Sequence, residues 1–330
     1  MGDPERKTSA DIHSDMSKAL KTVKDPILRS LLADAGRRIE EAESKKTKDS
    51  VPVKLKEKLT ALPPVEKQVV FAFLPHEMAK VSIFFPMSDK ELRSDSRLIG
   101  KIVQENSWGK VTIEGVKLAI FEEDIFLAIM KLAKSKNRLC TDAGKYYIKT
   151  SIKEVANLLY ASTGYSTSKV ADMLLRALKN FQLVRFEIDL KGAGGKRGGI
   201  TGSIGNIVES FYHEKETNEL SIYFNPHFCM FFLESMLTNI NFSLRRKLKK
   251  DGSKALLRFL SAHSNPGRMH ILTVLKAINY NTDQPMSMLR HRFKSFVSEL
   301  KKYAVLSGKT KIHEDDTVSF GINSLCEKDV

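Results

Sequence analysis

The sequence predicts an α+β fold built from two tandem winged helix-turn-helix domains, and three observations support this prediction. Around residues 151–225, and again around residues 253–322, a short helical stretch, a polar turn and a basic amphipathic helix lead into a pair of strands. The chain of 330 residues also has a formal net charge of +15. The two segments share this order of elements but little residue identity.

The composition limits the class of protein. A chain of this length usually carries two or three domains. Its 54 basic side chains exceed the 39 acidic ones, which favours a polyanion as partner. Cys140, Cys229 and Cys326 form no C-x-x-C motif, so we expect neither disulfides nor a cysteine zinc site. With no membrane-length apolar run and no signal-peptide core, the predicted location is the cytoplasm.

The first predicted region, residues 1–62, is a polar, basic and largely disordered arm. It is rich in Lys, Asp and Ser and contains no aromatic residue, so little of it can pack. Pro26 to Glu43 has an apolar stripe that predicts one helix. This helix is either solitary on a flexible arm or a contact for a host protein or a second copy.

The first winged-helix domain is predicted over residues 63–240, beginning at the break Pro63-Pro64. The apolar residues between 68 and 87 predict extended segments. Residues 111–118 predict a small hairpin that turns at Glu114-Gly115, and residues 120–134 predict a helix.

The DNA-reading part of this domain is predicted from a capping box. Ser151 and Glu154 fit the S-x-x-E pattern and open a short helix, and Ser166 or Thr167 caps the next one. A strand over 181–190 and later strands up to residue 225 make a wing, with a helix over 226–237 after it. The wing has a mobile glycine-rich tip, because residues 192–202 hold six glycines.

The second winged-helix domain is predicted over residues 241–330. It begins with a basic segment, residues 242–250, that joins the two domains and has five cations between Arg245 and Lys250. Helices follow near residues 255–260 and 271–278. The strongest helical pattern runs from Met286 to Tyr303, and short strands at 304–307 and 317–320 close a second wing.

A recognition helix needs an apolar back and a polar front, because it enters a major groove about 12 Å wide. Arg binds guanine through two hydrogen bonds, whereas Lys more often contacts phosphate. For each single residue, the competing interpretation is an ordinary solvated charge on an amphipathic helix. The predicted DNA contacts are Ser168, Lys169, Arg176, Lys179, Lys196, Arg197, Arg245, Arg246, Arg290, Arg292 and Lys294.

Enzymatic alternatives lack their motifs. The glycine-rich tract contains no G-x-x-x-x-G-K-[ST], and a G-x-G-x-x-G pattern breaks at Arg197. The eight histidines form neither H-x-H nor H-E-x-x-H. We therefore expect no catalytic residue, no cofactor and no metal site.

From about residue 70 onward the chain resembles the TrfA-like plasmid replication initiators. The stretches that carry the resemblance are 74–84, 118–134, 163–169, 222–228, 255–260, 285–286 and 293–300. The resemblance implies binding to direct repeats (iterons) in a plasmid origin and opening of an adjacent AT-rich region. It also implies recruitment of a host helicase, a host initiator and the polymerase sliding clamp. Monomers would be the initiating species and dimers the inactive or regulatory form.

Some initiators of this type reach the clamp through a short hydrophobic peptide. The nearest segment here contains Val81, Ile83, Phe84 and Phe85, but it lacks the usual leading Gln, and a core strand is the competing interpretation. Two other functions stay open for the whole chain. One is a tandem winged-helix transcriptional repressor that binds an operator as a dimer. The other is an RNA-associated or scaffold protein that uses its charge loosely.

Overall fold

The computed structural model describes most of the chain after residue 70, within one compact unit that spans residues 62–330. The predicted N-terminal arm and its helix lie outside the described residues. The described ranges are 71–80, 82–88, 91–92, 98–106, 109–135, 139–142, 145–160, 167–190, 201–229, 237–263 and 266–323.

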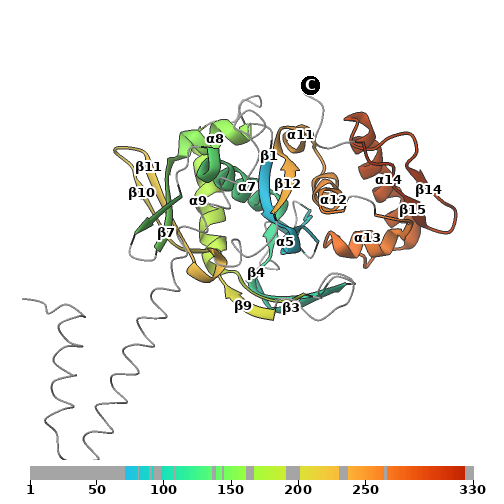
Figure 1. Cartoon of the computed structure of the whole chain (residues 1–330), viewed down its shortest axis with the longest axis horizontal. Coiled ribbons are helices and arrows are strands. Elements are labelled where there is room, and N and C mark those ends of the chain that lie inside the picture. Colours follow the sequence, from blue (N-terminus) through green and yellow to red (C-terminus); the bar gives the residue numbers. More distant parts are fainter. Residues whose placement is uncertain are drawn as a thin grey trace, which may run out of the picture. The chain divides into compact units, whose positions relative to one another are not determined.

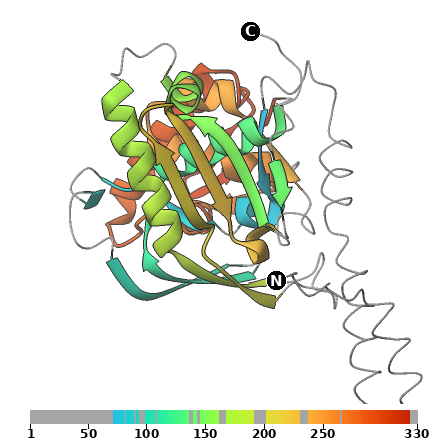
Figure 2. The same ribbon diagram turned by 90° about the vertical axis from the view of Figure 1, so that its left-hand side faces the viewer.

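The first winged helix follows the order helix, strand, strand, helix, helix, strand, strand (Figure 1). Its last strand, β11, lies between β10 and β7 in an antiparallel sheet ordered β10-β11-β7-β6. Figure 2 shows the long helix α9 beside this sheet. The elements are α7 (Ile120–Ser135), β6 (Leu139–Asp142), β7 (Lys145–Ser151), α8 (Ile152–Tyr160), α9 (Thr167–Leu183), β10 (Val208–Glu214) and β11 (Glu219–Phe224).

The second winged helix has the same order with shorter strands and with one strand, not two, before its pair of helices. Its sheet is ordered β13-β15-β14, so the strand that precedes the helix pair, β7 or β13, pairs with the last strand in both units. The same connectivity in two segments of low identity confirms the predicted α+β fold. The elements are α12 (Asp251–Ser261), β13 (Met269–His270), α13 (Ile271–Ala277), α14 (Met286–Lys302), β14 (Lys311–Ile312) and β15 (Thr317–Ser319).

An additional hairpin interrupts the first winged helix between α9 and β10. Strands β8 (Arg185–Leu190) and β9 (Thr201–Gly205) join β3 (Leu98–Asn106) and β4 (Gly109–Val116) in a sheet ordered β3-β4-β8-β9. The single wing predicted over residues 181–225 is therefore wrong. Only β10 and β11 form the wing, and β8 and β9 belong to a different sheet.

Two predicted boundaries in this region are also wrong. Helix α9 continues through Leu183, because buried Phe181 extends the helical spacing of Val170, Leu174 and Ala177. Strand β4 runs through the supposed turn at Gly115. That glycine has φ +92°, and a side chain there would collide with the carbonyl oxygen of Leu183. Gly115 therefore serves close packing of β4 on the end of α9.

Several short elements connect the two winged helices. Strand β1 (Phe71–Pro75) pairs with β12 (Leu237–Asn241), which leads directly into α11 (Phe242–Lys247). The sequence pattern predicted that a helix over residues 226–237 ends at Leu237. This residue instead begins strand β12. Helix α5 (His76–Lys80) follows β1, and β2 (Phe84–Phe85) pairs in parallel with β5 (Leu118–Ala119).

Aromatic rings fill the core of the first winged helix around Phe126. Its ring centroid lies 6.2 Å from those of Phe84 and Phe181 and 5.8 Å from that of Phe228. Each buried Phe contributes about 1.5–3 kcal/mol through removal of its surface from water. The core therefore ties β2, α7 and α9 together, which fixes the helix that the sequence predicts as the first reader of DNA.

Candidate nucleic-acid interface

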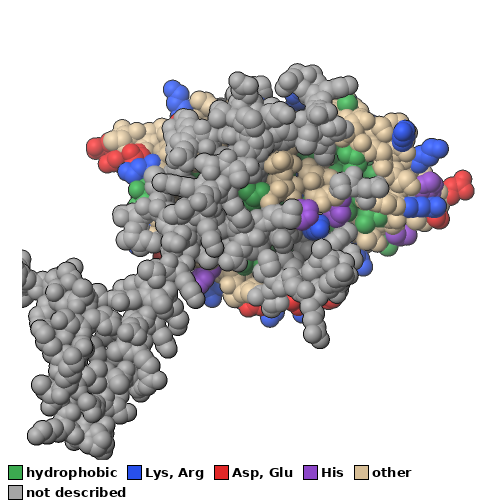
Figure 3. All heavy atoms as spheres, viewed as in Figure 1, with side chains coloured by type: hydrophobic (Ala, Val, Ile, Leu, Met, Phe, Trp, Pro, Cys, Tyr) green, Lys and Arg blue, Asp and Glu red, His purple; other side chains and the backbone are tan. Residues whose placement is uncertain are grey.

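Helix α14 has an apolar back and a polar front, as a recognition helix requires. Its front exposes small, apolar and cationic side chains at helical spacing, and Lys and Arg gather over this part of the molecule (Figure 3). The buried side consists of Leu289, Phe293, Phe296, Val297 and Leu300. The exposed side consists of Ser287, Met288, His291, Arg292, Lys294, Ser298, Lys301 and Lys302.

The two arginines predicted on this helix have different surroundings. The Arg290 guanidinium donates to the carbonyl oxygens of His313 and Glu314, at 2.6 and 3.1 Å. It also pairs with the Asp316 carboxylate at 2.8 Å. Arg292 is exposed and forms no ion pair with a described residue. The structure thus gives Arg290 a role in holding the second wing, and leaves Arg292 and exposed Lys294 on the open front of α14.

The turn of the second wing is acidic. Glu314, Asp315 and Asp316 follow one another there, and Arg268 pairs with Asp315 at 2.5 Å. Hydrogen bonds from Thr317, together with the charge of Arg268, lower the pKa of the Asp315 carboxyl. Because carboxylates repel phosphate, the tip of this wing is less suited to contact a DNA backbone than the exposed cations of α14.

In the first winged helix, α9 presents the predicted side chains to solvent. Ser168, Lys169, Arg176 and Lys179 are exposed, opposite a buried stripe that includes Val170. The Arg176 guanidinium lies 5.0 Å from the centre of the Phe121 ring, a cation–π contact that steadies it. Lys196 and Arg197 lie outside the described residues.

The prediction that Arg245 contacts DNA is wrong. Its side chain is completely buried and pairs with Glu123 at 3.1 Å and Asp124 at 2.6 Å. It also donates to the Lys254 carbonyl oxygen at 3.0 Å. Arg246, the next residue, is exposed and donates to the Leu158 carbonyl oxygen. The run of cations over residues 245–250 is thus divided by α11 between the interior and the surface.

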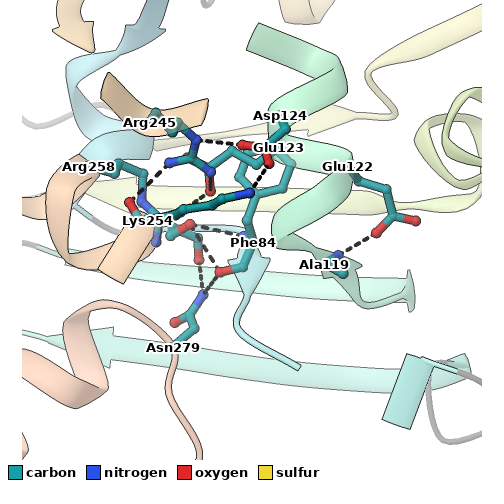
Figure 4. Close-up of polar contacts among 10 residues, drawn as sticks. Phe84, Ala119, Glu122, Glu123, Asp124, Arg245, Lys254, Arg258 and Asn279 are labelled. Carbon is teal, nitrogen blue, oxygen red and sulfur yellow. Dashed lines mark hydrogen bonds and ion pairs between the residues drawn. The ribbon is translucent and has the colours of Figure 1, made fainter. Parts of the chain in front are cut away.

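Arg245 belongs to a buried ionic cluster that joins the two winged helices (Figure 4). Glu123 and Asp124 come from α7, and their partners come from α11 and α12. Lys254 pairs with Asp124 at 2.6 Å, and Arg258 pairs with Glu123. Burial alone would raise the pKa of Asp124, but Lys254 and Arg245 outweigh it and lower that pKa. The acidic run Glu122-Glu123-Asp124 is the feature of the sequence that could have indicated buried partners for Arg245.

A second contact between the domains lies beside this cluster. The Asn279 side-chain amide, just after α13, donates to the carbonyl oxygens of Ser82 at 2.5 Å and Phe84 at 3.3 Å (Figure 4). Asn279 itself has φ +58°, a conformation that Asn tolerates well. Ionic and amide contacts therefore both hold α12 and α13 against the first domain.

The predicted clamp-binding segment is internal. Ile83, Phe84 and Phe85 are 0%, 0% and 7% exposed, and β2 pairs with β5. Val81 lies outside the described residues. In the folded chain these three residues cannot bind a partner, because they form part of the core. The competing interpretation as a core strand is confirmed.

Among the described residues, no group of His, Cys, Asp and Glu side chains is arranged to hold a metal ion. No helix in the same part of the chain combines the length and apolar character needed to cross a membrane.

Comparison with known proteins finds one matching family model and two similar solved structures. Residues 101–261 match the family model described as "Initiator Replication protein, WH1", a range that contains the whole first winged helix and α12. Two crystal structures of domains 2 and 3 of RctB are similar to 76% and 68% of this chain. They are covered over 98% and 94% of their own length, at 10% and 9% identity, with TM-scores of 0.43 and 0.36. No curated protein matches the sequence.

Proposed function

We propose, from the premise that this chain belongs to the Rep-type plasmid replication initiators, that it binds direct repeats in an origin through both winged helices. Binding of these iterons would then promote opening of an adjacent AT-rich region. The open region would be the place where host replication proteins assemble. The proposed protein is not an enzyme, and DNA-binding energy drives the opening.

The observation that carries this proposal is the front of α14. It is long enough to lie along a major groove, and it offers Arg292, Lys294 and Ser298 on the side opposite its buried residues. Arg292 is suited to guanine and Lys294 to phosphate. Helix α9 supplies a second cationic front through Lys169, Arg176 and Lys179.

The energy for opening comes from holding two helices in one compact unit. A protein that grips two stretches of groove can bend the duplex, at a cost of about 1–6 kcal/mol for a site of this size. Contacts to about six to ten phosphates offset this cost, and each lowers the slope of log affinity against log salt by about 0.9. Strong salt dependence of binding is therefore expected.

Permanganate footprinting on a supercoiled plasmid that carries the origin tests the proposal. The expected result is reactive, unpaired thymines in the AT-rich region only when the protein is added. Arg292→Ala should need a higher protein concentration to give the same reactivity, because it weakens binding to the repeat. Protection of repeats without any reactive thymine would instead support a transcriptional repressor. Equal binding to unrelated duplex would favour a loosely charged scaffold protein.

Oligomeric state and host contacts belong to the same proposal. A monomer is the proposed binding form, in equilibrium with a dimer that does not initiate. Host partners are the helicase, the host initiator and the sliding clamp, reached through surfaces other than the buried segment Ile83–Phe85. Analytical ultracentrifugation with and without a single repeat measures this equilibrium, and DNA should shift it toward the monomer.

A further inference from the structure

One side chain on the front of α14 has a chemistry that phosphate contacts do not explain. Among the described residues, four large apolar side chains are exposed: Val103, Leu183, Tyr212 and Met288. Of these only Met288 lies on α14, and it is 48% exposed. The core of this domain is filled by other residues of the helix, so Met288 is not required for packing.

The position of Met288 favours contact with base edges. It is the third residue of α14, after Pro285, and the N-terminal residues of a recognition helix contact bases in the groove. Arg292 follows four residues later and is also exposed, so the two side chains are neighbours on one face of the helix. Leu289 and Phe293, one residue further along in each case, are buried and fix the rotation of this face.

We propose that Met288 selects a thymine in the repeat by packing its side chain against the C5-methyl group in the major groove. This inference rests on the proposed function, since it assigns specificity to the same helix. Thymine is the only base that offers a methyl group there. Four residues of helix advance about 6 Å, which is within two base-pair steps of about 3.4 Å. The guanine bound by Arg292 therefore lies within two base pairs of this thymine.

The expected effect is modest and specific to one position. Burial of one methyl-sized group changes affinity about four-fold. A contact of this kind is insensitive to salt, whereas contacts made by Lys294 and Arg176 weaken as salt screens their charge. Discrimination between thymine and its unmethylated analogue should therefore persist at a salt concentration that weakens overall binding.

The test uses the full chain and a duplex of about 20 base pairs that the protein enriches from a random library. Each thymine is replaced in turn by deoxyuridine, which removes only the methyl group. The unaltered protein should lose affinity about four-fold at one position, near a guanine. Met288→Ala and Met288→Gln should bind the two duplexes equally at that position, and Met288→Leu should retain the difference.

Leu183→Ala is the matched control, since it removes an exposed apolar side chain from the first winged helix. It should keep the full difference between thymine and deoxyuridine. The inference is overturned if the unaltered protein is indifferent to every replacement, or if Met288→Ala and Met288→Gln still discriminate. Enrichment of no sequence at all would instead overturn the proposed function. Because Met288 is exposed, circular dichroism should show all its variants folded.

Discussion

At the scale of single residues, the two arginines of α14 illustrate how surroundings separate side chains of the same type. Arg290 donates hydrogen bonds to His313, Glu314 and Asp316 of the second wing. Arg292, two residues later in α14, is exposed to solvent. A guanidinium that already donates three hydrogen bonds has less capacity to read a base. The wing, however, depends on it.

Arg292→Ala should therefore weaken binding to the cognate repeat by about 1–3 kcal/mol and relax preference at one base position. Arg290→Ala should instead weaken cognate and random duplexes by similar factors, because it leaves the Asp316 carboxylate without its cationic partner beside α14. Fluorescence anisotropy with single-base variants of the repeat measures both effects. If Arg290→Ala also relaxed preference at one position, the separation of roles would be wrong.

Asp251, at the start of α12, has a pKa raised from 3.8 to about 6. Burial is the main cause; Asp124 and Glu123 raise the pKa further, while Lys254 and Arg245 lower it. Because the folded-state pKa is raised, the contribution of Asp251 to stability is complete below pH 3.8 and is lost as pH rises through about 6. At one pKa unit per 1.36 kcal/mol, the loss is at most about 3 kcal/mol.

Asp251→Asn should remove this pH dependence. The variant should be more stable than the unaltered protein above pH 7, and its advantage should shrink between about pH 6 and pH 4. Urea unfolding at several pH values measures the free energy of unfolding of both proteins. In the difference between the two values, the titration of all other groups cancels. Parallel pH profiles for the two proteins would contradict the assignment to Asp251.

At the scale of elements, local signals predicted the helices well. The Glu154 backbone N–H donates to the Ser151 side-chain oxygen at 3.2 Å, which confirms Ser151 as the cap of α8. The apolar periodicity of residues 286–303 also predicted α14 to within one residue. Both signals lie within a few residues of the structure they determine.

Strand pairing was less predictable, because partners are distant in sequence. Strand β4 pairs with β8, with Ile113 opposite Phe186, and nothing near residue 113 indicates this. Gly115 was assigned to a turn because its contact, Leu183, is also distant in sequence. Its actual role is to let β4 approach Leu183 closely. The burial of Arg245 likewise depends on Glu123, more than a hundred residues earlier.

Gly115→Ala should test the packing of β4 on α9. The substitution introduces a side chain that meets the Leu183 carbonyl oxygen at φ +92°, so unfolding free energy should fall by more than about 1 kcal/mol. Gly202→Ala in β9 is the matched control, since open space surrounds that position. Chemical denaturation should show a loss for the first variant and little change for the second. Equal stability of both would contradict the close approach.

At the scale of the whole molecule, the net charge of +15 pointed to a polyanion but not to where it binds. Three of the cations, Arg245, Lys254 and Arg258, serve the internal cluster, and the second wing ends in acidic residues. The composition therefore overstates the number of cations that are free to contact DNA, and exposed cations on α9 and α14 are those that the proposed function uses. The predicted domain boundaries, 63–240 and 241–330, stay a prediction.

The ionic cluster makes the two winged helices depend on each other, and Glu123→Gln tests this dependence. The change leaves buried Arg245 with Asp124, and it leaves buried Arg258 without an ion-pair partner among the described residues. Loss of one partner of a buried pair costs about 3–5 kcal/mol, since the remaining charge stays out of water. Calorimetry should therefore show the single unfolding transition of the unaltered protein shift downward and split. Glu219→Gln is the control, because Glu219 and its partner Lys149 are both largely exposed, and solvent screening leaves such a surface pair little effect on stability. Similar losses for both variants would show that the cluster does not hold the domains together, and DNA opening would then need another source of rigidity.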